Sequence, residues 1–216
     1  MAETKRYVIF DHDGVLVDTE PWYYAAGERA LADIGLTLDK EQYLREMSQG
    51  VGTWAQARAA GIDEPTIARL REVRDGYYQD YLRSEDIEIP GVVETLAELA
   101  PLVRMAIVTT AKRADFELIH ERRQIRQFME FVLVREDYER AKPHPEPYLT
   151  GLQRFGASKE ETLVVEDSAR GLRSAVAAGI DCAVVHNDFT RKQDFSQARW
   201  RIDTLGELAD IVRTAR

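Results

Sequence analysis

Short apolar runs that alternate with helical patterns are the feature that most constrains the fold of this 216-residue chain. Five runs are typical of buried strands: residues 7–10, 103–108, 131–134, 162–165 and 182–185. Helical patterns lie between the later runs, at residues 92–100, 112–123, 145–155 and 169–178. Because strands that alternate with helices form parallel sheets covered on both faces, the sequence predicts an α/β fold with a doubly wound, Rossmann-like core.

Residues 19–88 interrupt this alternation, because they contain helical patterns and no convincing strand. We therefore expect two domains, a core formed by residues 1–18 and 89–216 and an inserted α-helical cap domain formed by residues 19–88. The insertion follows the first strand directly, so it is expected above the carboxyl ends of the strands, where open α/β sheets bind ligands.

Composition and charge exclude several classes of function. The net charge of −9 disfavours binding to nucleic acid and to anionic membranes. No stretch approaches the roughly 20 apolar residues that cross a bilayer, and the N-terminus lacks the apolar core of a signal peptide. Cys182, the only cysteine, lies in an apolar run and is interpreted as a small buried side chain. We expect a cytoplasmic protein with no nucleic-acid or membrane partner, and the sequence leaves monomer or dimer open.

Acidic side chains follow two of the predicted strands. Asp11 and Asp13 leave the first strand two residues apart, so both carboxylates can face the same crevice. A turn capped by aspartates would explain such a pair, and the functional alternative is a nucleophile beside a general acid/base. Glu166 and Asp167 end a second apolar run, where two acids must be solvated, paired or bound to a metal.

Four segments, in this order, resemble the motifs of the haloacid dehalogenase superfamily, and the resemblance covers essentially the whole chain. They are Asp11-His12-Asp13-Gly14-Val15-Leu16-Val17-Asp18-Thr19, Ile107-Val108-Thr109, Lys142-Pro143-His144-Pro145-Glu146-Pro147-Tyr148 and Val164-Val165-Glu166-Asp167-Ser168. One departure is His12, where many relatives carry an apolar or aromatic residue. Its side chain is expected to point away from the metal, so no catalytic role is assigned to it.

The resemblance implies a role for each acid of the motifs. Asp11 is the expected nucleophile and a metal ligand, and Asp13 is the expected general acid/base, with its backbone carbonyl on the metal. The implied cofactor is Mg²⁺, which prefers oxygen ligands and retains several waters. Asp167 is expected to bind it directly, and Glu166 through water.

The remaining expected site residues hold the phosphoryl group or read the substrate. By resemblance, the Thr109 hydroxyl and the Thr110 amide hold a phosphoryl oxygen, while Lys142 adds positive charge and steadies Asp11. The insertion resembles the helical cap of the phosphatase and β-phosphoglucomutase branch. In that branch the loop between the second and third cap helices reads the substrate, which here makes residues 45–54 candidates, above all three side chains: Arg45, Gln49 and Trp54.

The expected activity is therefore that of a Mg²⁺-dependent phosphatase that hydrolyses a small phosphorylated metabolite through an aspartyl-phosphate. A sugar-phosphate mutase is the main alternative, although mutases of this branch carry a histidine where Tyr23 stands. Asp13 argues against a dehalogenase, because a halide leaving group needs no proton. Lys40 is the only lysine between residues 19 and 85, which disfavours a phosphonatase. A non-catalytic metabolite-binding protein is less expected, because all the acids are present.

Overall fold

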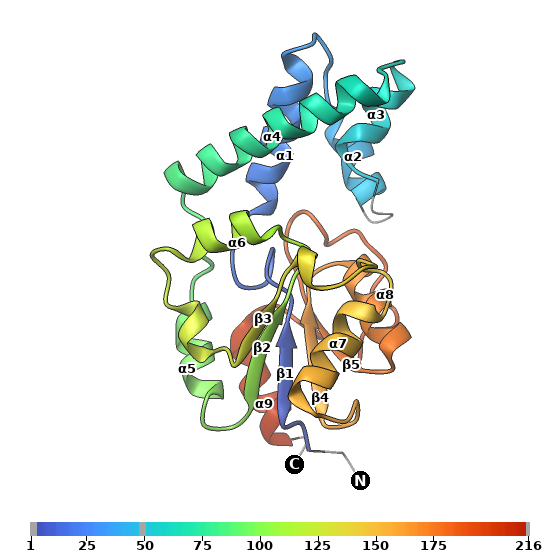
Figure 1. Ribbon diagram of the computed structural model, residues 1–216. Helices are drawn as coiled ribbons and strands as arrows, with labels where there is room; N and C mark the ends of the chain where they lie inside the picture. Colours follow the sequence, from blue (N-terminus) through green and yellow to red (C-terminus); the bar gives the residue numbers. More distant parts are fainter. Residues whose placement is uncertain (1–3, 48–50, 215–216) are drawn as a thin grey trace. The chain divides into compact units, whose positions relative to one another are not determined.

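The computed structural model describes residues 4–47 and 51–214 (Figure 1). The chain divides into two compact units, an α/β unit formed by Met1–Asp18 with Glu88–Arg216 and a helical unit formed by Thr19–Ile87. Within the described ranges, no helix combines the length and the apolar composition that a membrane crossing requires.

The α/β unit is built on a six-stranded parallel sheet in the order β3-β2-β1-β4-β5-β6. Its strands are β1 (Tyr7–Phe10), β2 (Arg104–Val108), β3 (Phe131–Leu133), β4 (Thr162–Glu166), β5 (Asp181–Val185) and β6 (Trp200–Ile202). The predicted fold class and the five predicted strands are confirmed. The sequence analysis missed β6, which is a three-residue edge strand with only one fully buried residue and therefore has no apolar run.

Helices cover both faces of this sheet, as expected for a doubly wound fold (Figure 1). The helices of this unit are α5 (Val92–Leu99), α6 (Arg113–His120), α7 (Glu146–Phe155), α8 (Ala169–Ala178) and α9 (Leu208–Thr214), with 3₁₀ turns η1 (Ile125–Phe128), η2 (Arg135–Asp137) and η3 (Leu205–Glu207). Helix α7 packs beside α8, and α5 packs beside α9. Gly156 and Gly179 end α7 and α8 with positive φ, a conformation that glycine adopts without strain.

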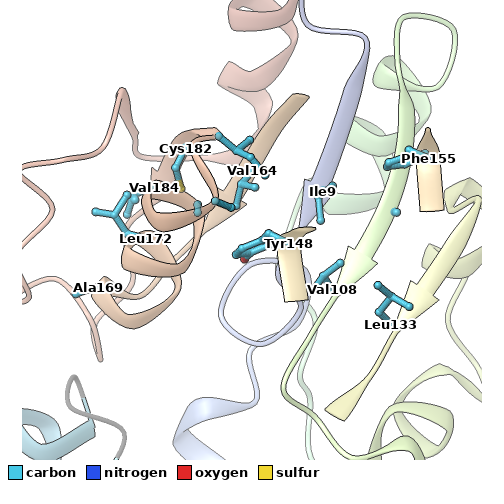
Figure 2. Close-up of a cluster of buried hydrophobic side chains, with 14 of the residues drawn as sticks. Ile9, Val108, Leu133, Tyr148, Phe155, Val164, Ala169, Leu172, Cys182 and Val184 are labelled. Carbon is cyan, nitrogen blue, oxygen red and sulfur yellow. The ribbon is translucent and has the colours of Figure 1, made fainter. Parts of the chain in front are cut away.

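One cluster of the core of the α/β unit lies between the sheet and the pair α7 and α8 (Figure 2). Strand residues such as Ile9, Val108 and Val164 are fully buried, because a parallel sheet with helices on both faces leaves no exposed face. Each such side chain contributes roughly 1.5–3 kcal/mol relative to an exposed one. Cys182 is buried in the same cluster, as predicted. The hydroxyl end of Tyr148 connects this core to the polar groups at the carboxyl ends of the strands.

The helical unit consists of α1 (Glu20–Ala32), α2 (Lys40–Met47), α3 (Thr53–Ala59) and α4 (Glu64–Ser84) among the described residues. Side chains cap two of the helix starts. Asp39 accepts a hydrogen bond of 2.6 Å from the Gln42 amide, and Asp63 accepts one of 2.9 Å from the Thr66 amide. Helix α4 packs along α1, with Ile67 and Leu70 buried on its apolar side.

Candidate active site

The polar groups of the candidate site meet at the carboxyl ends of the three central strands. Strand β1 pairs with β2 on one side and with β4 on the other, so Phe10 lies beside both Ile107 and Val165. The residues that follow these strands therefore come together from three distant parts of the sequence. Asp11, Thr109 and Asp167 occupy this edge of the sheet, where open α/β proteins bind ligands.

A buried lysine joins the acids of two of these strands. Lys142 Nζ lies 2.8 Å from Asp11 Oδ1 and 2.8 Å from Glu166 Oε1, and it also donates to the Val108 carbonyl oxygen at 2.9 Å. The lysine side chain is only 2% exposed. A buried ammonium group is stable only when it is paired, and here two carboxylates supply the pairing. Their charges and hydrogen bonds outweigh the opposing effect of burial and raise the pKa of Lys142.

Burial and neighbouring charges affect the two carboxylates differently. Burial, followed by the charge of Glu166, raises the pKa of Asp11 to about 6 in spite of Lys142. Burial acts in the same direction on Glu166, but the charge of Lys142, with hydrogen bonds from Lys142, Tyr148 and Ser168, lowers the pKa of this carboxyl below its ordinary value. Of the two, Glu166 is the more acidic carboxyl and Asp11 the more basic one.

Both oxygens of Glu166 already accept hydrogen bonds. Oε1 accepts from Lys142 and, at 2.5 Å, from the Tyr148 hydroxyl. Oε2 accepts from the Asp167 amide and from the amide and hydroxyl of Ser168. Ser168 also caps α8, because its hydroxyl accepts from the Gly171 amide. Glu166 is therefore fixed as the anchor that holds Lys142 against Asp11.

The acids fit a hard divalent cation. Asp11, Glu166 and Asp167 offer carboxylate oxygens that all lie within 4.8 Å of one another. Asp167 is oriented by Asn187, whose side-chain amide donates to Oδ2 at 2.6 Å. Gly14 has a φ of +76° and faces the same oxygen, and a β-carbon at this position would stand 2.2 Å from it. Only glycine thus leaves room for Asp167 beside the loop after β1.

Asp13 faces the hydroxyl that follows β2. The Thr109 hydroxyl donates to Asp13 Oδ2 at 3.3 Å and accepts from the Ala111 amide at 3.0 Å. The Tyr138 hydroxyl donates to the Thr109 carbonyl oxygen at 2.7 Å, which fixes the loop beyond the strand. Thr110 is partly exposed, and the guanidinium of Arg170 lies 3.5 Å from its hydroxyl. Arg170 brings a second cation to the strand ends.

The structure thus brings together all the predicted site residues of the α/β unit. They are Asp11, Asp13, Thr109, Thr110, Lys142, Glu166 and Asp167. The predicted cap residues belong to the helical unit. Arg45 is exposed and lies 3.9 Å from Glu41, whereas Trp54 is buried within that unit, beside the guanidinium groups of Arg71 and Arg74. Gln49 lies outside the described residues.

Sequence reasoning missed several residues that shape this site. The sequence motifs include Tyr148 but do not single it out, and Asn187, Arg170 and His120 lie outside them. Asn187 follows β5, which pairs with β4. Its position just beyond a predicted strand is the sequence feature that could have identified it as a site residue. His120 gave no signal, because its partner lies 108 positions away in the sequence.

The parallel sheet and the acids at its strand ends define an α/β protein whose candidate ligand site lies at this edge of the sheet. The model of the haloacid dehalogenase-like hydrolase family matches residues 8–185 of the chain. Protein CbbY from Rhodobacter capsulatus is 32% identical, over 94% of this chain and 95% of that protein. N-acetylmuramic acid 6-phosphate phosphatase from Pseudomonas aeruginosa is 28% identical, over 97% and 96%.

The solved structures agree with this assignment at the level of the fold. CbbY from Rhodobacter sphaeroides, crystallised in complex with phosphate, superimposes with a TM-score of 0.80 at 24% identity, over 94% of this chain and 96% of that one. The chain belongs to the haloacid dehalogenase-like hydrolase family, as its sequence motifs predicted. Family and relatives indicate an enzyme of the phosphoric monoester hydrolase class.

Proposed function

We propose that this protein is a Mg²⁺-dependent phosphatase that hydrolyses a small phosphorylated metabolite, such as a sugar or polyol phosphate, through an aspartyl-phosphate on Asp11. The observation that carries the proposal is the position of Lys142, which is bonded to Asp11 and Glu166 at 2.8 Å each. The contact between Lys142 and Asp11 holds the carboxylate of Asp11, whose pKa is raised, at the carboxyl end of β1. There Asp11 lies within the group of acids that includes Asp167.

In the first step a carboxylate oxygen of Asp11 attacks phosphorus and the bond from phosphorus to the ester oxygen breaks. Asp13 gives its proton to the departing alkoxide, which leaves as an alcohol. In the second step water attacks phosphorus, Asp13 takes the proton of that water, and the bond from phosphorus to Asp11 breaks. Orthophosphate leaves and Asp11 returns to its starting state.

Several groups of the chain neutralise the charge that this reaction concentrates. Lys142 stays protonated, because its pKa is raised, and it faces Asp11 throughout. The Thr109 hydroxyl and the Thr110 amide are placed to hold phosphoryl oxygens. Mg²⁺, when bound by Asp11, Asp167 and the Asp13 carbonyl, would offset the repulsion between carboxylate and phosphate. Because the oxygens of Glu166 are already occupied, its contribution to this site would pass through water.

The substrate class in this proposal rests on the helical unit and on the relatives. N-acetylmuramic acid 6-phosphate phosphatase, one of these relatives, is named for a phosphorylated sugar derivative. In our proposal residues 19–88 act as the cap, and Arg45, Gln49 and Trp54 select the leaving group. Contacts to parts of the substrate that do not react set the choice of substrate, while the strand-end residues set the chemistry.

A phosphate-release screen over phosphorylated metabolites, with Mg²⁺, tests the proposed function. We expect release from at least one sugar or polyol phosphate. Asp11→Asn should abolish it while preserving the fold, because an amide keeps the shape of the side chain but cannot form the acyl-phosphate. Turnover of more than a few per cent in this variant would contradict the nucleophile assignment. Isomerisation of a sugar 1-phosphate faster than phosphate release would identify a mutase instead.

A further inference from the structure

The side chain between the two aspartates of the first motif forms a buried contact that the proposed mechanism does not use. His12 is fully buried, and its Nε2 lies 2.9 Å from Nε2 of His120, the last residue of α6. Phe116 packs on both imidazoles, with ring centroids 5.0 Å from His12 and 4.4 Å from His120. Buried polar groups are costly unless they are hydrogen-bonded, so a pair at this position requires a reason.

The other side of His12 faces Asp13. His12 Nδ1 lies 3.5 Å from Asp13 Oδ2, and among the described residues it has no other polar partner. This distance is longer than an ordinary hydrogen bond and within the range of an electrostatic contact between a ring nitrogen and a carboxylate. The same oxygen of Asp13 accepts the hydrogen bond from Thr109. Two side chains therefore converge on Oδ2.

The direction of the hydrogen bonds follows from the chemistry of imidazole. In a neutral histidine one ring nitrogen donates and the other accepts. A carboxylate oxygen beside Nδ1 of His12 favours the tautomer that carries its proton on Nδ1, which leaves Nε2 of His12 as an acceptor. His120 must then donate from its own Nε2. Burial, with the nearby charges of Arg126 and Arg123, lowers the pKa of His120 to about 3, so His120 is neutral.

We propose that His120 is a positioning residue for the general acid: through His12 it directs an N–H group at Asp13 Oδ2, so that the proton of Asp13 resides on Oδ1 and faces the leaving group. This inference rests on the proposed function, because it assumes that Asp13 protonates an alkoxide. It also accounts for histidine at position 12. An apolar side chain at position 12 would remove the contact from His12 to Asp13 Oδ2 and keep the one from Thr109.

The consequence is a specific dependence on the leaving group. Without the donor at position 120, His12 can adopt the other tautomer, which turns a lone pair toward Asp13 Oδ2. The proton of Asp13 is then drawn to Oδ2, away from the substrate. An alkyl phosphate needs that proton because an alkoxide is a poor leaving group, whereas 4-nitrophenolate leaves without it.

Two amide variants of His120 provide a matched test. The side chain of His120→Gln can place an N–H near the position of Nε2, whereas His120→Asn is equally polar but too short to reach His12. We propose to measure kcat/KM for an alkyl phosphate and for 4-nitrophenyl phosphate. This quantity reports the phosphorylation step, because it covers only the steps up to the irreversible departure of the alcohol. Phe116→Leu serves as a packing control, and melting temperatures monitor folding.

We expect His120→Asn to lower kcat/KM roughly tenfold or more for the alkyl phosphate and less than about threefold for the aryl phosphate, within the range of general acid catalysis. His120→Gln should recover most of the alkyl activity, and Phe116→Leu should affect both substrates equally. Equal losses on both substrates in His120→Asn, or no recovery in His120→Gln, would overturn the inference. If the wild-type protein released no phosphate from any substrate, the proposed function itself would fail.

Discussion

Gly171 lies in the first turn of α8, where a β-carbon would stand 1.8 Å from the carboxyl carbon of Glu166. Glycine inside a helix usually lowers stability, and replacing it with alanine raises stability by roughly 0.5–1 kcal/mol. Here the close approach reverses this preference. A larger residue at this position would displace the Glu166 carboxylate. Lys142 would then lose the contact that holds it in place.

We predict that Gly171→Ala lowers the free energy of unfolding by about 1–3 kcal/mol, the usual range for overpacking, and abolishes most of the phosphate release. Gly76→Ala is the matched control. Gly76 lies in α4, and a β-carbon added there would have nothing within 4 Å, so this change should raise stability by roughly 0.5–1 kcal/mol. Urea denaturation of both variants checks the prediction. Similar effects in the two variants would mean that Glu166 relaxes without cost.

At the scale of single elements, the predicted substrate residues on α2 and α3, Arg45 and Trp54, differ in their exposure. Arg45 near the end of α2 is exposed, and its contact with Glu41 is a surface ion pair worth about 0–1 kcal/mol. Trp54 at the start of α3 is only 7% exposed and packs beside Arg74. The side chain of Arg45 is exposed, whereas that of Trp54 is packed within the helical unit.

We predict that Arg45→Ala alters the rank order of substrates while the melting temperature stays nearly constant. Trp54→Ala should lower stability by roughly 3–5 kcal/mol, as expected when a buried tryptophan is truncated. The values of kcat/KM over the metabolite panel, compared with those for a small generic phosphate, separate selection from packing. If Arg45→Ala lowered kcat/KM equally for every substrate, Arg45 would not take part in substrate recognition.

At the scale of the whole molecule, the strand ends concentrate negative charge in a protein whose net charge is already −9. Asp11, Glu166 and Asp167 lie together, and Lys142 is the cation that pairs with two of them. A cation that binds only the folded state raises stability by mass action, by about 2.7 kcal/mol at a concentration one hundred times its dissociation constant.

We therefore predict that Mg²⁺ raises the melting temperature and that a chelator reverses the increase and abolishes phosphate release. Ca²⁺ should stabilise the fold but support little turnover, because its longer and more variable coordination misplaces the attacking oxygen. Asp167→Asn should reduce the thermal shift, whereas Glu94→Gln, an exposed change on α5, should leave it intact. Full activity in excess chelator would contradict the metal site.

The sequence by itself determined the secondary structure and the family. Apolar runs specify buried strands because both faces of a parallel sheet are covered, and glycines such as Gly156 end helices because they accept positive φ. The four motifs placed the acids, Thr109 and Lys142 at or beyond strand ends. The sequence analysis missed β6 and α9, because three and seven residues are too short to show a clear period.

Only the tertiary structure decided which side chains meet. Lys142 binds Asp11 across 131 positions of sequence, and His12 contacts His120 across 108. Periodicity shows which face of an element is apolar, but it carries no information about which element lies beside it. The order of the strands sets these distances, because β1 lies between β2 and β4 in the sheet. The same order makes Glu166 the anchor of Lys142, since its oxygens meet Lys142 and Tyr148 only in the folded sheet.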